Sequence, residues 1–238
     1  ADLSFSPLGL DRASVSEDSV AALCAAIVAR YGIERAIQPS RDGVPMVFHD
    51  YDLGRLTGLS GPIAQRSAAD LGDIGLSGGG GTIPTLAAVL DMVAGRTPLL
   101  VEIKDQDGAL GTNVGPLEMA VCNLLADYDG DVALMSFNPN SVAACQTYAP
   151  NTPRGITTCP YPAEDWPTVP ETVRQAQRAI PDFDRVGACF ISHQQDDLDS
   201  GAVAALKSRG VPIFCWTIRG TAMEAQARKI ADNITFEG

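Results

Sequence analysis

Two kinds of segment alternate along the chain. Short runs of β-branched and other apolar residues are typical of strands, and the longer stretches between them carry apolar residues at helical spacing. Eight strands are predicted, at residues 2–8, 32–38, 98–104, 131–137, 153–159, 187–192, 211–218 and 233–236. The clearest helical stretches are 16–32, 85–95, 116–130, 139–149 and 200–210. This pattern over 238 residues predicts an α/β fold, a (β/α)8 TIM barrel forming a single domain over residues 1–238.

One segment, residues 42–85, breaks the alternation. It contains an extra predicted strand, "VPMVFH", followed by a turn-rich stretch with four consecutive glycines at 78–81. The glycines do not lead from a strand into a helix at the spacing of a phosphate-binding loop, so we expect a connector there. Loops that follow barrel strands form the active face, and an insertion after the second strand is therefore expected beside any site.

Composition narrows the classes of partner. The formal charge of −12 argues against nucleic acid and anionic membranes, which both favour a basic face. No apolar run approaches the ~20 residues of a transmembrane segment. No signal peptide is visible at the start, unless one was removed before residue 1. The six cysteines are scattered without a C-x-x-C pair, as expected of buried small residues in a reducing compartment, and we expect a cytoplasmic protein.

The first candidate for chemistry is His49, one of two histidines in the chain. It ends the apolar run of the insertion and is followed by Asp50 and Asp52. A histidine at a strand end is more often structural than functional. Whether His49 has a functional role therefore depends on which residues lie near it. Glu34 and Glu102 lie in predicted strands, and because unpaired carboxylates are rarely fully buried, we expect both at the barrel mouth.

These residues fall within a longer resemblance. The run "SRDGVPMVFHDYDLGRLTGLSGPI" resembles the signature insertion of the glycerophosphodiester phosphodiesterase (GDPD) family. "IPTLAAVL", "LLVEIKD", "MSFNPNS" and "FCWTI" follow in that family's order, from about residue 15 to the end. The resemblance implies a TIM barrel that splits glycerophosphodiesters into glycerol 3-phosphate and an alcohol, a reaction of lipid metabolism.

The resemblance also implies roles for individual residues. His49 matches a catalytic histidine, and Glu34 and Glu102 match carboxylates that bind Mg²⁺ or Ca²⁺. Lys104 matches a lysine that meets the phosphate, and Trp216 an aromatic residue beside the substrate. A Lewis acid and a proton donor suit an anionic diester with a poor leaving group. In the absence of a metal, Lys104 is as readily explained as an ion-pair partner of a glutamate, and Trp216 as a packing residue.

Three departures from the family pattern fall on different roles. The His-Arg pair expected at the end of the first strand is replaced by Ser6-Pro7, or by Pro7-Leu8 in the other register. The aspartate of the metal-binding Glu-x-Asp pair, whose glutamate is Glu34, is replaced by Ala36, which weakens a hard-cation site. Losing an acid–base group costs ~10²–10⁴ in rate. We therefore expect the family reaction to be very slow or absent.

Two hypotheses follow. In the first, the chain has a degenerate active site, with His49 as a catalytic remnant, and acts as a binding or assembly component. No helix is predicted after the eighth strand, which suggests a protein partner covering it. In the second, the chain is an active metal-dependent phosphodiesterase that binds a phosphodiester small molecule. His193, expected at the barrel mouth after the sixth strand, would then replace the missing acid, and Asp11 could approach the metal.

Overall fold

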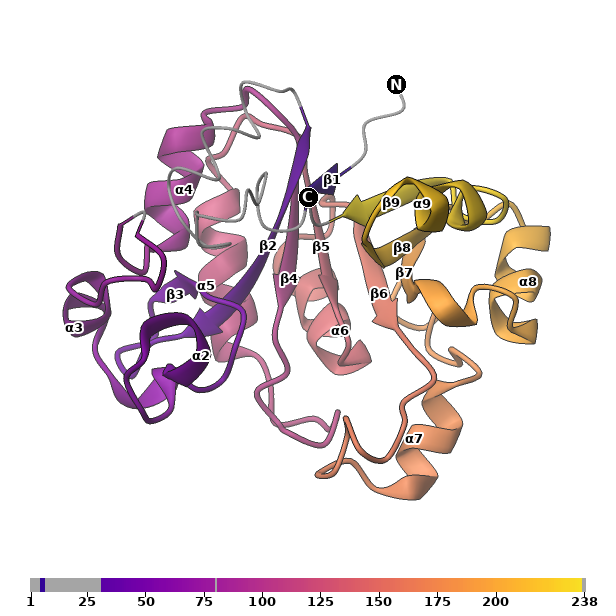
Figure 1. Cartoon of the computed structure of the whole chain (residues 1–238), viewed down its shortest axis with the longest axis horizontal. Coiled ribbons are helices and arrows are strands. Elements are labelled where there is room, and N and C mark those ends of the chain that lie inside the picture. The colour runs from indigo at the N-terminus through magenta and orange to yellow at the C-terminus, as the bar shows by residue number, and fades with distance from the viewer. Residues whose placement is uncertain (1–4, 7–30, 80, 237–238) are drawn as a thin grey trace.

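The computed structural model describes residues 5–6, 31–79 and 81–236. Eight parallel strands close into a barrel, because the first strand pairs with both the second and the last. The α/β TIM barrel predicted from the hydrophobic pattern is confirmed (Figure 1). The barrel strands are β1 (Phe5–Ser6), β2 (Gly32–Pro39), β4 (Leu99–Ile103), β5 (Val132–Ser136), β6 (Arg154–Thr158), β7 (Phe190–Gln194), β8 (Ile213–Ile218) and β9 (Asn233–Phe236).

Helices surround this barrel on its outside (Figure 1). They are α4 (Leu86–Val93), α5 (Pro116–Leu125), α6 (Pro139–Tyr148), α7 (Glu171–Gln177), α8 (Gly201–Ser208) and α9 (Thr221–Ala227). Local sequence explains their ends: the Thr85 hydroxyl accepts a hydrogen bond from the Ala88 amide at the start of α4. Gly210, just after α8, has φ +78°, the left-handed conformation that is typical of a glycine after a helix end. Residues 16–30 of the helix predicted at 16–32 lie outside the described residues. Of the other two, Tyr31 is in no helix or strand and Gly32 begins β2.

Successive side chains of each strand point alternately outward and inward. In β2, Ile33 and Ile37 pack outward in a cluster shared with α4 and α5, which places Glu34 inward. At the floor of the barrel, the rings of Phe190 and Phe214 stack at 4.8 Å. Gly155 makes room for them, since a Cβ at that position would lie 2.3 Å from the Phe190 ring. The barrel is therefore a packed core with its polar inward residues near one end.

The insertion forms a small unit of its own beside the end to which the strands point (Figure 1). It contains β3 (Pro45–Val47), α2 (Gly54–Thr57), the 3₁₀ turn η1 (Ile63–Gln65) and α3 (Ala68–Gly72). β3 pairs antiparallel with β2, so the extra strand joins the sheet without entering the barrel. Apolar residues such as Phe48, Leu53 and Leu71 form its separate core.

Several details differ from the sequence predictions. β7 begins at Phe190, because Gly187 ends a turn and Ala188 and Cys189 lie outside any strand. The last strand is not bare: Ile234 is 2% exposed and packs in a cluster that includes Ala227 at the end of α9. Cys189 is exposed, whereas the other four described cysteines are buried, and all five are free thiols. No helix within the described part of the chain is long and apolar enough to cross a bilayer.

Candidate functional site

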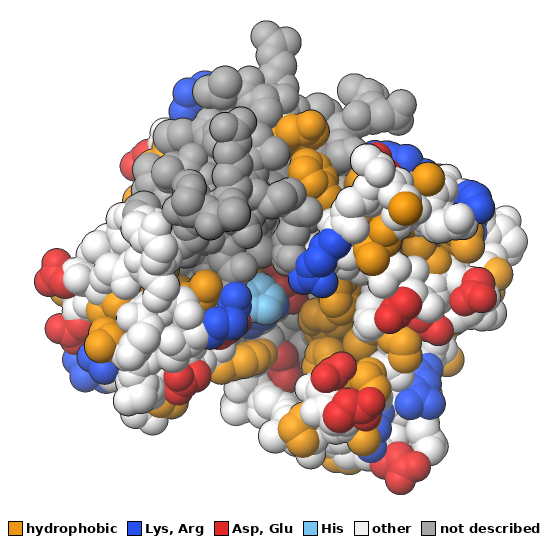
Figure 2. Space-filling view, viewed as in Figure 1, with side chains coloured by type: hydrophobic (Ala, Val, Ile, Leu, Met, Phe, Trp, Pro, Cys, Tyr) orange, Lys and Arg blue, Asp and Glu red, His pale blue; other side chains and the backbone are white. Residues whose placement is uncertain are grey.

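A small cavity of about 80 Å³ opens at the barrel mouth. Four residues that the sequence analysis connected with metal binding, catalysis or phosphate binding line this cavity together: Glu34, His49, Glu102 and Lys104. Trp216, singled out as a substrate neighbour, completes the opposite wall. The rest of the lining consists of Met135, Phe137, Thr157, Thr217 and Thr235. In the space-filling view a histidine lies in a hollow between the insertion and the opposite half of the barrel (Figure 2).

Adjacent strands bring the two glutamates to this mouth. The parallel register of β2 and β4 pairs Glu34 with Leu100 and Ala36 with Glu102, so the inward residues of both strands face the same space. Glu34 is 7% exposed and Glu102 is 6% exposed. The expectation that both carboxylates lie at the mouth therefore agrees with their position, although each is more buried than an ordinary surface carboxylate.

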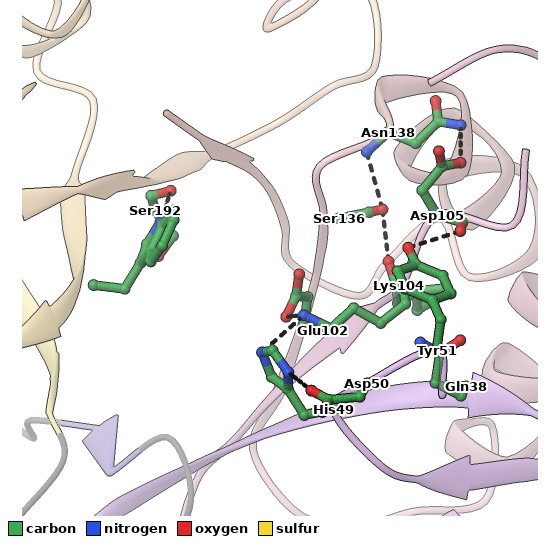
Figure 3. Close-up of polar contacts among 12 residues, drawn as sticks. Gln38, His49, Asp50, Tyr51, Glu102, Lys104, Asp105, Ser136, Asn138 and Ser192 are labelled. Atoms are coloured by element: carbon green, nitrogen blue, oxygen red, sulfur yellow. Dashed lines mark hydrogen bonds and ion pairs between the residues drawn. The ribbon is translucent and has the colours of Figure 1, made fainter. Parts of the chain in front are cut away.

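Lys104 connects the two elements of the site (Figure 3). Its ammonium donates a 2.7 Å hydrogen bond to Glu102 Oε2, and its Nζ lies 3.3 Å from His49 Nε2. The Lys104 and Glu102 side chains are 11% and 7% exposed, so this is a buried ion pair. The other carboxylate oxygen, Glu102 Oε1, is buried and accepts no hydrogen bond from any described residue.

The opposite side of the His49 ring is oriented by the insertion. His49 Nδ1 lies 2.8 Å from Asp50 Oδ1, and Arg55 donates to both oxygens of Asp50, at 2.7 and 2.8 Å. Burial raises the pKa of Asp50, but the hydrogen bonds from His49 and Arg55 outweigh it, and the pKa lies well below the usual value. The carboxylate is therefore ionised at neutral pH and holds Nδ1, while Nε2 faces Lys104 and the cavity.

His193 does not reach this cavity, contrary to the sequence prediction. It pairs in register with Thr158, and both point to the outer, helix-covered face together with Ile156 and Ile191. Its Nδ1 lies 2.8 Å from the Thr158 hydroxyl and its Nε2 lies 3.1 Å from Asp197. Burial lowers its pKa even though Asp197 acts to raise it. His193 is thus a hydrogen-bonded histidine of the barrel wall.

Trp216 is both a packing residue and a wall of the cavity. Its indole N–H donates to the Ser192 carbonyl at 3.0 Å, and its ring meets Phe137 edge-on at 5.6 Å. Phe137 in turn contacts Trp166, with ring centroids 5.0 Å apart. The sequence predictions missed Phe137 and Trp166. Phe137 follows directly after β5, and this position at a strand end was the signal that could have identified it.

The described residues supply few ligands for the divalent cation that the resemblance implies. The buried, unbonded Glu102 Oε1 would suit a cation, but the neighbouring oxygen is already paired with Lys104. The third ligand position is Ala36, which supplies no oxygen. Among the described residues, no three His, Cys, Asp or Glu side chains lie together as a metal site. The described residues therefore do not fit a tightly held divalent cation, which needs more oxygen ligands than they supply.

Of the other residues named in the sequence analysis, Ser6 lies in β1, while Pro7, Leu8 and Asp11 lie outside the described residues.

Solved structures share this fold at low sequence identity. An Oleispira antarctica phosphodiesterase in complex with its product sn-glycerol-3-phosphate matches with a TM-score of 0.77 and 21% identity, covering 98% of this chain and 92% of that one. A glycerophosphodiester phosphodiesterase from Agrobacterium tumefaciens matches at 0.73 and 20%, covering 100% and 96%. One from Thermotoga maritima matches at 0.72 and 19%, covering 99% and 95%. No curated protein matches the sequence significantly.

The family comparison is more specific than the fold. The model of the Glycerophosphoryl diester phosphodiesterase family matches residues 11–233, which is nearly the whole chain. Enzymes of this family are typically metal-dependent. The match includes the insertion with His49 and the strand residues Glu34 and Glu102. The chain therefore belongs to the glycerophosphoryl diester phosphodiesterase family.

Proposed function

We propose that this barrel binds the phosphate group of a phosphodiester, or of a phosphomonoester such as glycerol 3-phosphate, and hydrolyses the diester very slowly or not at all. The observation that carries the proposal is the position of Lys104, whose ammonium lies between Glu102 and His49. The strand partner of Glu102 is the apolar Ala36. A fixed ammonium can bind an anion, but it leaves Glu102 a poor ligand for a metal.

The cavity supplies groups for binding. The Lys104 ammonium is a point charge for one phosphate oxygen, and a protonated His49 Nε2 would donate to a second. Threonines 157, 217 and 235 line the same cavity and can donate from their hydroxyls. Glu102 Oε1, which has no donor among the described residues, is placed to accept from a hydroxyl of the bound molecule.

Catalysis requires more than this set. A poor alkoxide leaving group needs a proton donor, and the nucleophile needs a base or a metal. His49 is the one histidine that the described residues bring to the cavity, since His193 faces the helix layer. A single histidine, in a site that does not fit a divalent cation, explains phosphate binding better than rapid hydrolysis of the diester.

The test is hydrolysis of glycerophosphocholine and bis-p-nitrophenyl phosphate by the purified chain with Mg²⁺, Ca²⁺ or EDTA. We expect no metal-dependent turnover above that of His49→Ala, together with saturable binding of glycerol 3-phosphate by calorimetry. Activity that appears in the Ser6→His/Ala36→Asp double variant would identify the departures from the family pattern as the cause. Failure to bind glycerol 3-phosphate would overturn the proposal.

The second candidate is an active metal-dependent phosphodiesterase. It is favoured by the ordered arrangement of Arg55, Asp50 and His49, which orients the imidazole as a catalytic histidine would require. It predicts turnover that needs Mg²⁺ or Ca²⁺, stops with EDTA and is lost in His49→Ala. That result would replace the binding proposal.

A protein partner also belongs to the binding proposal, but the original reason for it is weakened. Ile234 and Phe236 of β9 already pack with the cluster that contains α9, and Phe236 meets the Tyr31 ring edge-on at 5.1 Å. An assembly role would therefore be supported only by a complex observed in solution. If size-exclusion chromatography finds a monomer without a partner, the assembly role is excluded.

A further inference from the structure

Two buried cysteines on neighbouring helices have no role in the site described above. Cys122 lies on α5 and Cys145 on α6, and these helices pack against each other on the outside of the barrel (Figure 1). Each cysteine is 3% exposed, and both belong to the apolar cluster between the helices and the barrel wall. Residues that are scattered in the sequence therefore meet in the helix layer.

The two thiols are in direct contact. A side-chain hydrogen bond joins them, and it lowers the pKa of Cys122 while it raises that of Cys145, so Cys145 is the donor. Among the described residues this is the one pair of thiols joined by a hydrogen bond. A disulfide requires two sulfur atoms that can approach without movement of the backbone, and helices that already bring two thiols into contact meet this requirement.

The surroundings make the two thiols unequal. Burial and the Glu118 carboxylate, one turn earlier on α5, act to raise the pKa of Cys122, but the Cys145 thiol is the largest influence and Arg154 adds to it, so the pKa is lowered. Glu118 is itself held by the Gly115 amide, which donates to its Oε2 at 2.6 Å. Because the thiolate is the nucleophile in disulfide exchange, Cys122 is the thiol that reacts first.

We propose that Cys122 and Cys145 are a reversible dithiol–disulfide pair that joins α5 to α6 covalently by exchange with a low-molecular-weight disulfide. The Cys122 thiolate attacks one sulfur of the small disulfide, whose S–S bond breaks and releases one thiolate. Cys145 then attacks the Cys122 sulfur of the mixed disulfide and releases the second. The protons of Cys122 and Cys145 pass to the two released thiolates, so two protein thiols are oxidised and one small disulfide is reduced to two thiols.

The expected consequence is a more stable barrel wall. Residues 122–145, which the link encloses, contain β5 and the mouth residue Phe137. Closing this loop restricts the unfolded chain, and it changes the folded chain little because the thiols already touch. Neither cysteine lines the cavity at the mouth, so the inference is independent of phosphate binding and of phosphodiester turnover.

The test incubates the full chain with bis(2-hydroxyethyl) disulfide, a reagent small enough for buried thiols. Free thiols are then alkylated, and the linked peptides are identified by mass spectrometry without reduction. We expect one intramolecular link, between Cys122 and Cys145, and a melting temperature about 5–10 °C above that of the reduced chain. Dithiothreitol should reverse both changes.

Cys122→Ser and Cys145→Ser should each abolish the rise in melting temperature, whereas Cys189→Ser, at the exposed cysteine, should retain it. Each oxidised variant is compared with its own reduced sample, so a less stable variant remains informative. A link to any other cysteine would overturn the proposal. So would the absence of a link when Cys189 has formed a mixed disulfide with the reagent, or a link between Cys122 and Cys145 that fails to raise the melting temperature.

Discussion

The two halves of the barrel mouth differ in chemistry although one barrel builds both. The half formed by β2, β4 and the insertion carries Glu34, Glu102, Lys104 and His49, and Lys104 contacts both Glu102 and His49. The other half, from the end of β5 to β8, presents aromatic rings that contact one another. The charged half depends on pairs that must remain complete, whereas the aromatic half depends on shape. Substitutions should therefore have different consequences in the two halves.

The largest effect is expected for Lys104→Met. Removing the ammonium leaves the buried Glu102 carboxylate uncompensated, and breaking a buried ion pair in this way costs ~3–5 kcal/mol of unfolding free energy. Urea denaturation would measure this loss, and calorimetry would measure the loss of glycerol 3-phosphate binding. The matched control is Lys104→Met/Glu102→Gln, which should recover most of the stability but not the binding. Equal destabilisation in both variants would contradict the ion-pair explanation.

Asn138→Ala should have the next largest effect, because Asn138 supports the loop that the two halves share. Its buried amide donates to Asp105 Oδ1 and to the Gly111 carbonyl, both at 2.8 Å. Removing it leaves buried acceptors without donors, which costs ~1–3 kcal/mol. Phosphate binding should weaken as well, which calorimetry with glycerol 3-phosphate would measure. A variant as stable as the parent chain would contradict this role of Asn138.

Asp50→Asn should have a smaller effect, confined to the charged half. The pKa of Asp50 is lowered in the folded state, so its contribution to stability is complete above its ordinary value of 3.8 and is lost as the pH falls below that value. Thermal denaturation from pH 7 to pH 2 should therefore show less acid sensitivity in the variant. Phosphate binding should weaken because His49 loses its orienting carboxylate.

The smallest effect is expected outside the mouth, for His193→Gln. Burial lowers the pKa of His193 below 6.5, so its neutral form is favoured in the folded state. Stability is then complete above pH 6.5 and decreases as the pH falls through the lowered pKa. The difference in melting temperature between pH 7.5 and pH 5.5 should shrink in the variant. Phosphate binding should be unchanged, and a loss of phosphate binding would return His193 to the site.

The sequence predicted much of the charged half, because each of its residues lies within a short motif. His49 follows an apolar run. Glu102 lies in β4 and Lys104 follows directly after that strand, two residues later, a spacing that favours one face. The aromatic half was not predicted beyond Trp216. Tyr51, Phe137 and Trp166 lie in three separate loops or strand ends, and no spacing in the sequence relates them.

Strand direction and alternation explain both the success and the error. The apolar runs determined eight strands, their order and the barrel, since each run has one way to bury its outward residues beneath helices. They did not determine which face His193 occupies, because that depends on register with β6, where Thr158 is its partner. A shift of one residue moves a side chain to the other face of the sheet. Only the tertiary structure placed Lys104 on Glu102 and gathered the aromatic rings around a cavity, since both depend on contacts between segments distant in sequence.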